Sequence, residues 1–208
     1  MSNFSKRFLS SIFLIPLVFF IIYYGNLILV LFTFSCLILA FYEWYTISRN
    51  IILRFSGFIF LLFSFFSFYM LSFDLNKIFF VIIICITTDI GGYFFGKLLK
   101  GPKLIKISPK KTYSGMLGGY FLSLTSSFLI GNYFQIFNLD IYLFILVFTI
   151  STISQIGDIL ISYFKRLSKI KDTGNLIPGH GGLLDRIDGM IFAFPIFYLL
   201  NIFEFFSL

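Results

Sequence analysis

The chain has 208 residues, enough for one or two small domains, but its composition excludes an ordinary soluble protein. Hydrophobic residues make up 59% and charged residues 12%, so polar groups could not cover a water-exposed surface. The only two cysteines lie inside apolar runs, which excludes a disulfide-rich secreted scaffold. The formal net charge of +7 indicates an anionic partner, and its distribution decides between nucleic acid and phosphates at a membrane.

Seven apolar stretches approach or reach the roughly 20 residues that a helix needs to cross a membrane. They are 8–24, 27–45, 55–73, 78–96, 114–136, 141–164 and 187–206. Gly25-Asn26 alone separates the first two, which predicts a tight turn, whereas the connections 97–113 and 165–188 are long enough for a functional site. We therefore expect an all-α polytopic membrane protein with about seven transmembrane helices.

Lysine and arginine are unevenly distributed over the loops between these stretches. If the N-terminus is cytoplasmic, 15 of the 16 basic residues lie on the cytoplasmic side and only Lys77 lies outside. Because positive residues favour the cytoplasmic side, we expect that orientation. The dispersed charge, with no soluble basic domain to carry it, also argues against a nucleic-acid partner.

Two acidic residues interrupt apolar stretches, Asp89 in the fourth and Asp158 in the sixth. Burying a charge in hydrocarbon costs a few kcal/mol, so such residues usually face the bundle interior and serve function. Both lie roughly 10–12 Å from the cytoplasmic ends of their helices, at about 1.5 Å per residue. We therefore expect them to share a pocket that opens to the cytoplasm, the alternative being that each is only a polar contact between helices.

The sixth stretch places Asp158, Ser162, Lys165 and Lys169 on one helix face, at i, i+4, i+7 and i+11. Carboxylate oxygens suit a hard cation and ammonium groups suit phosphate oxygens, so this face is typical of a metal–phosphate site. The alternative is that its lysines only bind lipid headgroups.

The connection that follows is polar and rich in glycine, and it contains the only histidine, His180. Gly179, Gly181 and Gly182 allow backbone N–H groups to approach an anion closely. A general-base role for His180 is not required, because a phosphate nucleophile is already ionised at neutral pH. The alternative is that His180 only bonds its own loop.

Two carboxylates close this connection, Asp185 and Asp188, which share one side of a helical turn. With Asp158 they can supply three carboxylates to Mg²⁺, which prefers oxygen ligands. Alternatively, Asp188 is only an acidic residue favoured by a helix N-terminus.

One segment, 91–97, matches the first part of a phosphate-binding P-loop but has no Ser or Thr after its lysine and no strand before it. We reject it as a nucleotide-binding motif. Gly92 and Gly96 are instead expected to allow close helix contact, as are Gly115 and Gly119.

The C-terminal half closely resembles the signature of phosphatidate cytidylyltransferases, also called CDP-diacylglycerol synthases. The spacing runs without a gap from Ser162 to Asp188, through Ser162-Tyr163-Phe164-Lys165-Arg166, Lys171-Asp172, Pro178-Gly179-His180-Gly181-Gly182 and Asp185-Arg186-Ile187-Asp188. Two upstream segments, 89–96 and 107–112, resemble further parts of the family pattern.

The resemblance implies transfer of CMP from CTP to phosphatidic acid, giving CDP-diacylglycerol and pyrophosphate in phospholipid biosynthesis. It also implies Mg²⁺ with a second cation such as K⁺, a homodimer, and a multi-pass protein of the cell (inner) membrane with its active site facing the cytoplasm. The whole chain, 1–208, would form a single membrane-embedded domain, with N-terminal helices over 1–80 and the catalytic helices and loops over 81–208.

The resemblance also assigns candidate residues to roles. The metal-binding aspartates correspond to Asp158, Asp185 and Asp188. The candidate catalytic residues are Lys165, Arg166, Lys171, Asp172 and Arg186. The candidate substrate-binding residues are Asp89, Lys110, Lys111, Ser162, Gly179, His180, Gly181 and Gly182.

Two alternatives to a cytidylyltransferase are a CTP-dependent polyprenol or phytol kinase and a small ion-coupled transporter. The uninterrupted pattern over 162–188 favours the cytidylyltransferase over the kinase. A transporter would spread acidic residues through the membrane depth, whereas here they gather near one side.

Overall fold

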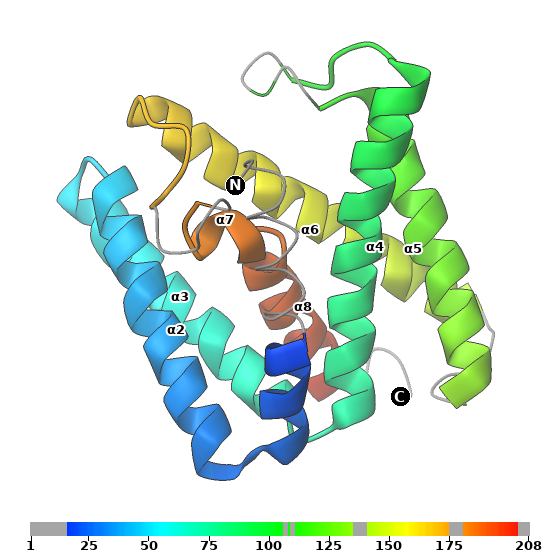
Figure 1. Cartoon of the computed structure of the whole chain (residues 1–208), viewed down its shortest axis with the longest axis horizontal. Coiled ribbons are helices and arrows are strands. Elements are labelled where there is room, and N and C mark those ends of the chain that lie inside the picture. The colour runs from blue at the N-terminus through cyan, green and yellow to red at the C-terminus, as the bar shows by residue number, and fades with distance from the viewer. Residues whose placement is uncertain (1–15, 106–107, 109–110, 135–140, 175–180, 204–208) are drawn as a thin grey trace, which may run out of the picture.

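The computed structural model describes residues 16–105, 108, 111–134, 141–174 and 181–203, and within them the chain is helical (Figure 1). A helical segment over 16–24 precedes the long helices. These are α2 (Asn26–Ile47), α3 (Ile51–Leu71), α4 (Leu75–Leu99), α5 (Tyr113–Phe134), α6 (Ile141–Leu167), α7 (Leu184–Ile187) and α8 (Met190–Ile202). The described residues contain no strand, only an isolated bridge between Lys103 and Thr112. The predicted all-α class is therefore confirmed.

Four helices in the described part of the chain, α2, α3, α4 and α6, are long and apolar enough to cross a membrane. Large apolar side chains such as Leu31, Phe34 and Phe55 are exposed on their outer faces, where lipid would cover them. The chain is therefore a polytopic membrane protein. The total of about seven spans and their orientation stay predictions.

The seventh predicted stretch, 187–206, does not begin as one continuous helix. α7 ends at Ile187, and the apolar helix α8 begins at Met190 and has 13 residues. Between them Gly189 packs so closely on α6 that an added Cβ would lie 2.3 Å from the Ser154 Oγ atom. The break therefore coincides with a close contact, which hydropathy alone does not reveal.

The ends of two helices follow from local sequence. Gly25 and Asn26 both have positive φ angles, 60° and 51°, which form the predicted tight turn before α2. Asp74 begins α4, because its carboxylate accepts hydrogen bonds from the backbone N–H groups of Asn76 (3.1 Å) and Lys77 (3.3 Å).

Helices α4 and α5 pack with their backbones in close contact at glycine. A Cβ added to Gly91 would lie 2.3 Å from the carbonyl oxygen of Gly118, and one added to Gly115 would lie 2.6 Å from that of Gly92. Because α4 runs without interruption from Leu75 to Leu99, segment 91–97 is helix and not a phosphate-binding loop. Both the rejection of the P-loop and the predicted glycine contact are confirmed.

Two buried apolar clusters hold the bundle together. The larger joins the 16–24 segment to α3, α4, α6 and α8 around residues such as Ile84 and Phe197. The smaller surrounds Trp44 and Leu184 and joins the C-terminal end of α2 to α3, α6, α7 and α8. Burying these side chains fixes α7 against α2 and α6.

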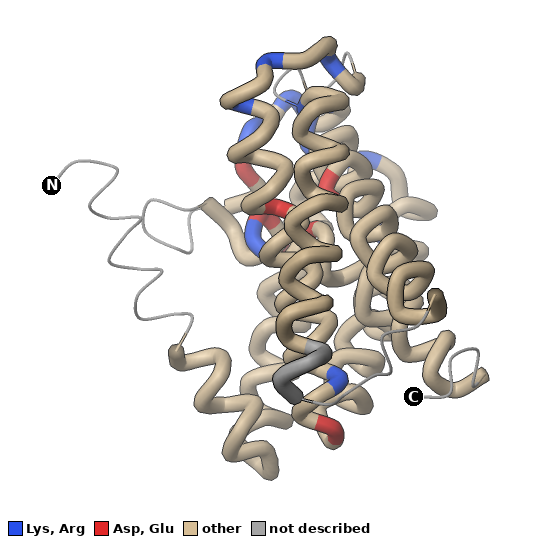
Figure 2. Tube along the Cα trace, turned by 90° about the vertical axis from the view of Figure 1, so that its right-hand side faces the viewer, with Lys and Arg blue, Asp and Glu red and all other residues tan. Residues whose placement is uncertain are grey.

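The charged residues gather at one end of the bundle. Figure 2 shows most of the Lys and Arg positions at that end, with acidic positions just beneath them. The start of α4 lies at the other end and carries Asp74 and Lys77, whose charged atoms are 3.9 Å apart. The predicted charge asymmetry is therefore present in the fold.

Candidate active site

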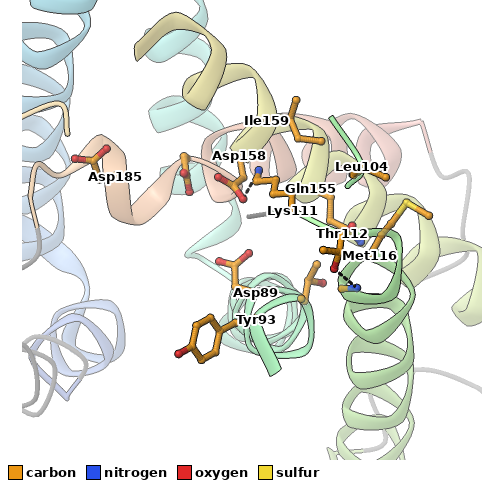
Figure 3. A pocket seen from close by; sticks show the side chains of 14 residues that line it. Asp89, Tyr93, Leu104, Lys111, Thr112, Met116, Gln155, Asp158, Ile159 and Asp185 are labelled. Atoms are coloured by element: carbon orange, nitrogen blue, oxygen red, sulfur yellow. Dashed lines mark hydrogen bonds and ion pairs between the residues drawn. The ribbon is translucent and has the colours of Figure 1, made fainter. Parts of the chain in front are cut away.

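A pocket of about 310 Å³ lies at the charged end of the bundle, between α4, α5, α6, α7 and the connection before α5. Five charged residues of the described part of the chain line it, together with polar and apolar side chains (Figure 3): Asp89, Lys111, Asp158, Asp185 and Asp188. The prediction that Asp89 and Asp158 share a pocket is confirmed. Among the described residues, four carboxylates thus face one cavity with a single lysine in its lining.

Lys111 forms an ion pair with the carboxylate of Asp158, with its Nζ atom 2.5 Å from Oδ2. Asp89 lies across the pocket from this pair (Figure 3). The connection that carries Lys111 is held by a backbone hydrogen bond from the Leu104 N–H to the Lys111 carbonyl (2.8 Å). The site therefore brings together side chains from α4, α6 and the 100–112 connection.

Two glycines bring Asp158 and Asp188 to the same wall of the pocket. A Cβ added to Gly157 would lie 2.8 Å from the carbonyl oxygen of Asp188, and Gly189 meets Ser154 as described above. The backbone that carries Asp188 therefore packs directly on α6, one residue from Asp158. Larger side chains at these glycines would push the two carboxylates apart.

Asp185 is held by three donors. Its Oδ1 atom accepts a hydrogen bond from Lys165 Nζ (2.7 Å), and its Oδ2 atom accepts from the backbone N–H groups of Thr173 (2.8 Å) and Gly182 (3.0 Å). Burial by itself raises the pKa of Asp185, but the hydrogen bonds from Lys165, Gly182 and Thr173 outweigh it and hold the pKa below its ordinary value. Asp185 therefore joins the end of α6 to both ends of the glycine-rich connection.

Glu43, which the sequence analysis did not single out, makes a second set of contacts with the same connection. It is 0% exposed on α2. Its Oε1 atom accepts from the Leu183 N–H (2.8 Å), and its Oε2 atom accepts from the Leu184 N–H (2.8 Å) and the Thr173 hydroxyl (2.7 Å). An acidic residue inside the apolar stretch 27–45 is the same signal that identified Asp89, and it could have identified Glu43.

The glycines of this connection lie against these two carboxylates. Gly181 has a φ of 92°, and a Cβ there would lie 2.7 Å from Asp185 Oδ2. A Cβ on Gly182 would lie 2.5 Å from Glu43 Oε2. The backbone N–H groups of Thr173, Gly182, Leu183 and Leu184 therefore donate to carboxylates of the chain itself.

The predicted face of the sixth helix ends earlier than expected. α6 ends at Leu167, and Lys169 adopts a left-handed conformation with a φ of 57°. The Ile170 N–H then bonds the Lys165 carbonyl and the Lys169 N–H bonds that of Arg166, each at 3.0 Å, which is the Schellman pattern of helix termination. The prediction that Lys169 continues the face of Asp158, Ser162 and Lys165 is therefore wrong.

Some of the remaining predicted site residues are described by the structure and lie outside the pocket lining, and the others lie outside the described residues. Arg166 donates to the Ile170 carbonyl (3.2 Å) and is exposed, as are Lys171, Asp172 and Arg186, whereas Ser162 is half-buried on α6. Lys110, Gly179 and His180 lie outside the described residues.

The donor set fits a hard cation in chemistry, although no three of the described His, Cys, Asp and Glu residues are arranged as ligands of one ion. Asp158, Asp185 and Asp188 all line the pocket. A carboxylate offers about four lone-pair sites. Asp185 uses three of them, so one remains on Oδ1. The predicted Mg²⁺ ligands stay a prediction.

Comparison with known proteins matches residues 49–203 to the Cytidylyltransferase family. A protein of Rickettsia bellii (strain RML369-C) named phosphatidate cytidylyltransferase is 40% identical over 172 residues, covering 76% of this chain and 74% of that protein. Proteins of the same name from Bacillus subtilis (strain 168) and Staphylococcus aureus (strain COL) are 38% and 40% identical, over 62% and 63% of this chain. The chain spans about half the length of these two, 48% and 51%.

Proposed function

Because this chain belongs to the cytidylyltransferase family, we propose that it transfers CMP from CTP to phosphatidic acid, giving CDP-diacylglycerol and pyrophosphate for phospholipid biosynthesis. One observation carries the proposal: the matched region, 49–203, contains every residue that lines the charged pocket. The proposed substrates are taken from the name of the relatives, phosphatidate cytidylyltransferase. The pocket lies in a membrane-spanning bundle, where a lipid substrate and a water-soluble nucleotide can meet.

The proposed reaction needs placement and charge compensation more than proton transfer. A phosphate oxygen of phosphatidic acid attacks the α-phosphorus of CTP, and the bond from that phosphorus to the oxygen bridging to the β-phosphate breaks. Pyrophosphate leaves with the electron pair. Because both substrates are anionic, the site must bring two negative groups together and offset the charge that grows on the leaving group.

We propose Asp158, Asp185 and Asp188 as the residues that hold Mg²⁺, with a second cation such as K⁺ in the same pocket. When bound, Mg²⁺ supplies a positive charge shared between these carboxylates and the substrate phosphates. The crowding of carboxylates around Lys111 supports this assignment, because the one ammonium group in the described lining balances only one of them.

In this proposal, basic side chains bind the phosphates of the two substrates. Lys111 lines the pocket, and Arg166, Lys171 and Arg186 are exposed on the elements that surround Asp185. Guanidinium and ammonium groups form charge-assisted hydrogen bonds with phosphate oxygens. Lys165 instead donates a hydrogen bond to Asp185, so its proposed role is to position that carboxylate.

We further propose that the charged end of the bundle faces the cytoplasm of a cell (inner) membrane and that the protein is a homodimer. The gathering of Lys and Arg at that end supports the orientation. A reporter fused after Leu208 should indicate a non-cytoplasmic C-terminus, and a cytoplasmic signal would contradict the seven-span arrangement. Cross-linking in native membranes should capture a species of twice the mass.

Activity is tested with the full chain purified in detergent and supplied with CTP, phosphatidic acid and Mg²⁺. The lipid product is identified by mass spectrometry. We expect CDP-diacylglycerol from the wild type and from Asp74→Asn, which changes a carboxylate at the opposite end of the bundle, and at most a trace from Asp188→Asn. No product from the wild type, or equal product from Asp188→Asn, would overturn the proposal.

A further inference from the structure

We propose that Glu43 is a positioning residue for the active site: from α2, its buried carboxylate holds the connection that presents Asp185 and Asp188 to the pocket. The inference rests on the proposed function for its consequence in catalysis. Its structural part, that Glu43 holds this connection in place, stands on the contacts alone.

Glu43 joins parts of the chain that are far apart in sequence. Its partners are Thr173, at the start of the connection, and Leu183 and Leu184, at its end, which lie 130 to 141 residues away. All three contacts are donated to the carboxylate, at 2.7 to 2.8 Å. One side chain therefore holds both ends of the connection at the same point on α2.

The contacts of Glu43 and Asp185 involve the same two backbone segments, residue 173 and residues 182–184. Thr173 donates its hydroxyl to Glu43 and its backbone N–H to Asp185. Gly182 donates its N–H to Asp185, and the next residue, Leu183, donates to Glu43. A shift of Thr173 or Leu183 away from Glu43 therefore moves the donors of Asp185 as well.

The second of these segments, 182–184, leads directly to the pocket. Leu184, bonded to Glu43, is the first residue of α7, and Asp188 follows the last residue of that short helix. α7 has only four residues, so its placement depends on contacts at its ends. Leu184 itself is fully buried in the smaller apolar cluster. Glu43 thus fixes the helix whose two ends carry Asp185 and Asp188.

Glutamine cannot replace Glu43 without conflict. In one orientation the amide NH₂ group meets the Leu183 N–H, and in the other it meets the Leu184 N–H, so two donors face each other either way. Glu43→Gln keeps the volume of the side chain, but it removes the negative charge and replaces one acceptor oxygen with an NH₂ donor. It is therefore the variant that tests the contacts rather than the packing.

The experiment compares Glu43→Gln, Thr173→Val and the double variant with a matched control, Thr125→Val. The Thr125 hydroxyl bonds only the backbone of its own helix, at Phe121 and Leu122. Each full-length protein is assayed in detergent for kcat, for KM of CTP, and for the rate of trypsin cleavage after Lys171, which lies just before Thr173.

We expect Glu43→Gln to lower kcat about 10- to 100-fold, as for residues that orient a metal ligand, with KM for CTP changed less than about threefold. Thr173→Val should lower kcat less, and the double variant should be no worse than Glu43→Gln, because both remove one set of contacts. Cleavage after Lys171 should accelerate in all three and stay unchanged in Thr125→Val.

The inference is overturned if Glu43→Gln keeps wild-type kcat and wild-type cleavage, or if the two substitutions reduce kcat multiplicatively. Should Glu43→Gln fail to fold, Thr173→Val must still show the faster cleavage, and wild-type cleavage there would overturn the inference. If the wild type itself makes no CDP-diacylglycerol, the proposed function fails, while the cleavage rates still decide whether Glu43 holds the connection.

Discussion

Two groups of carboxylates lie at the charged end of the bundle, and they differ in what surrounds them. Glu43 and Asp185 each accept three hydrogen bonds from the chain, and one of the three to Asp185 comes from the ammonium group of Lys165. Asp89, Asp158 and Asp188 face the pocket, which Asp185 also lines, and Lys111 is the only basic side chain in the described lining. Hydrogen bonds from the chain therefore satisfy the first group, whereas in the second group only Asp158 has a basic partner among the described residues.

This difference indicates that carboxylates serve two purposes in this protein, one in holding the fold and one in the pocket. A buried carboxylate that is fully paired fixes the elements around it, because breaking any contact leaves a charge without its donors. Carboxylates crowded around a water-accessible pocket repel one another until a cation arrives. We therefore expect substitutions in the first group to affect stability most and those in the second group to affect activity most.

The largest effect is expected from Asp158→Asn or Asp188→Asn, which remove a charge from the pocket. Activity should fall roughly 100- to 1,000-fold, the range found when a group that stabilises transition-state charge is lost. The melting temperature of Asp188→Asn should stay the same or rise, because repulsion between pocket carboxylates is relieved, whereas Asp158→Asn also removes the ion-pair partner of Lys111. Initial rates across a Mg²⁺ titration, together with melting curves, check both statements. Activity within threefold of the wild type would remove the distinction between the two groups.

A smaller effect, on stability, is expected from Lys165→Met, which leaves Asp185 without its cation. The side chains of Lys165 and Asp185 are only 11% and 6% exposed. Breaking a buried pair from one side costs about 3 kcal/mol. Thermal unfolding in detergent should show a clear drop in melting temperature, and the double variant Lys165→Met/Asp185→Asn should recover part of it. A double variant less stable than Lys165→Met would show that the pair is not coupled.

The pH dependence of stability gives a third prediction. Because the folded protein holds the pKa of Asp185 below its unfolded value, this group stabilises the fold above the unfolded pKa of about 3.9. That contribution is lost as the pH falls through the lower, folded value. Melting temperatures measured from pH 6 downward should therefore fall more steeply for the wild type than for Asp185→Asn. Parallel curves would contradict the assignment.

The smallest effect on activity is expected from Asp74→Ala, at the far end of α4. Loss of this N-terminal cap should cost about 1 kcal/mol of stability. The value of kcat should not change, because Asp74 lies outside the pocket lining. A large fall in kcat would show that stability of the bundle, rather than charge in the pocket, limits the reaction.

Much of this arrangement could be predicted from the sequence. The length of the apolar stretches placed α2 to α6 within a few residues, because each helix must satisfy its own backbone in lipid. The depth of Asp89 and Asp158 in two helices that run in the same direction predicted their shared pocket. Both inferences depend only on helix geometry and on the cost of burying charge.

The rest depends on tertiary contacts that local patterns do not encode. The sequence shows that Glu43 is an acidic residue in an apolar stretch, but not that its partners lie near residues 173 and 183. The left-handed residue at Lys169 ends α6 early although lysine is not a typical residue there. The break between α7 and α8 coincides with the contact of Gly189 with Ser154 on another helix.

The most direct test of the central claim follows the phosphorus atoms of CTP. CTP labelled at the α-phosphate or at the γ-phosphate is incubated with the full chain, phosphatidic acid and Mg²⁺, and the lipid fraction is counted. Transfer of CMP predicts that the α-label enters the lipid and the γ-label leaves as pyrophosphate. A γ-label in the lipid fraction would indicate a kinase and would contradict the account.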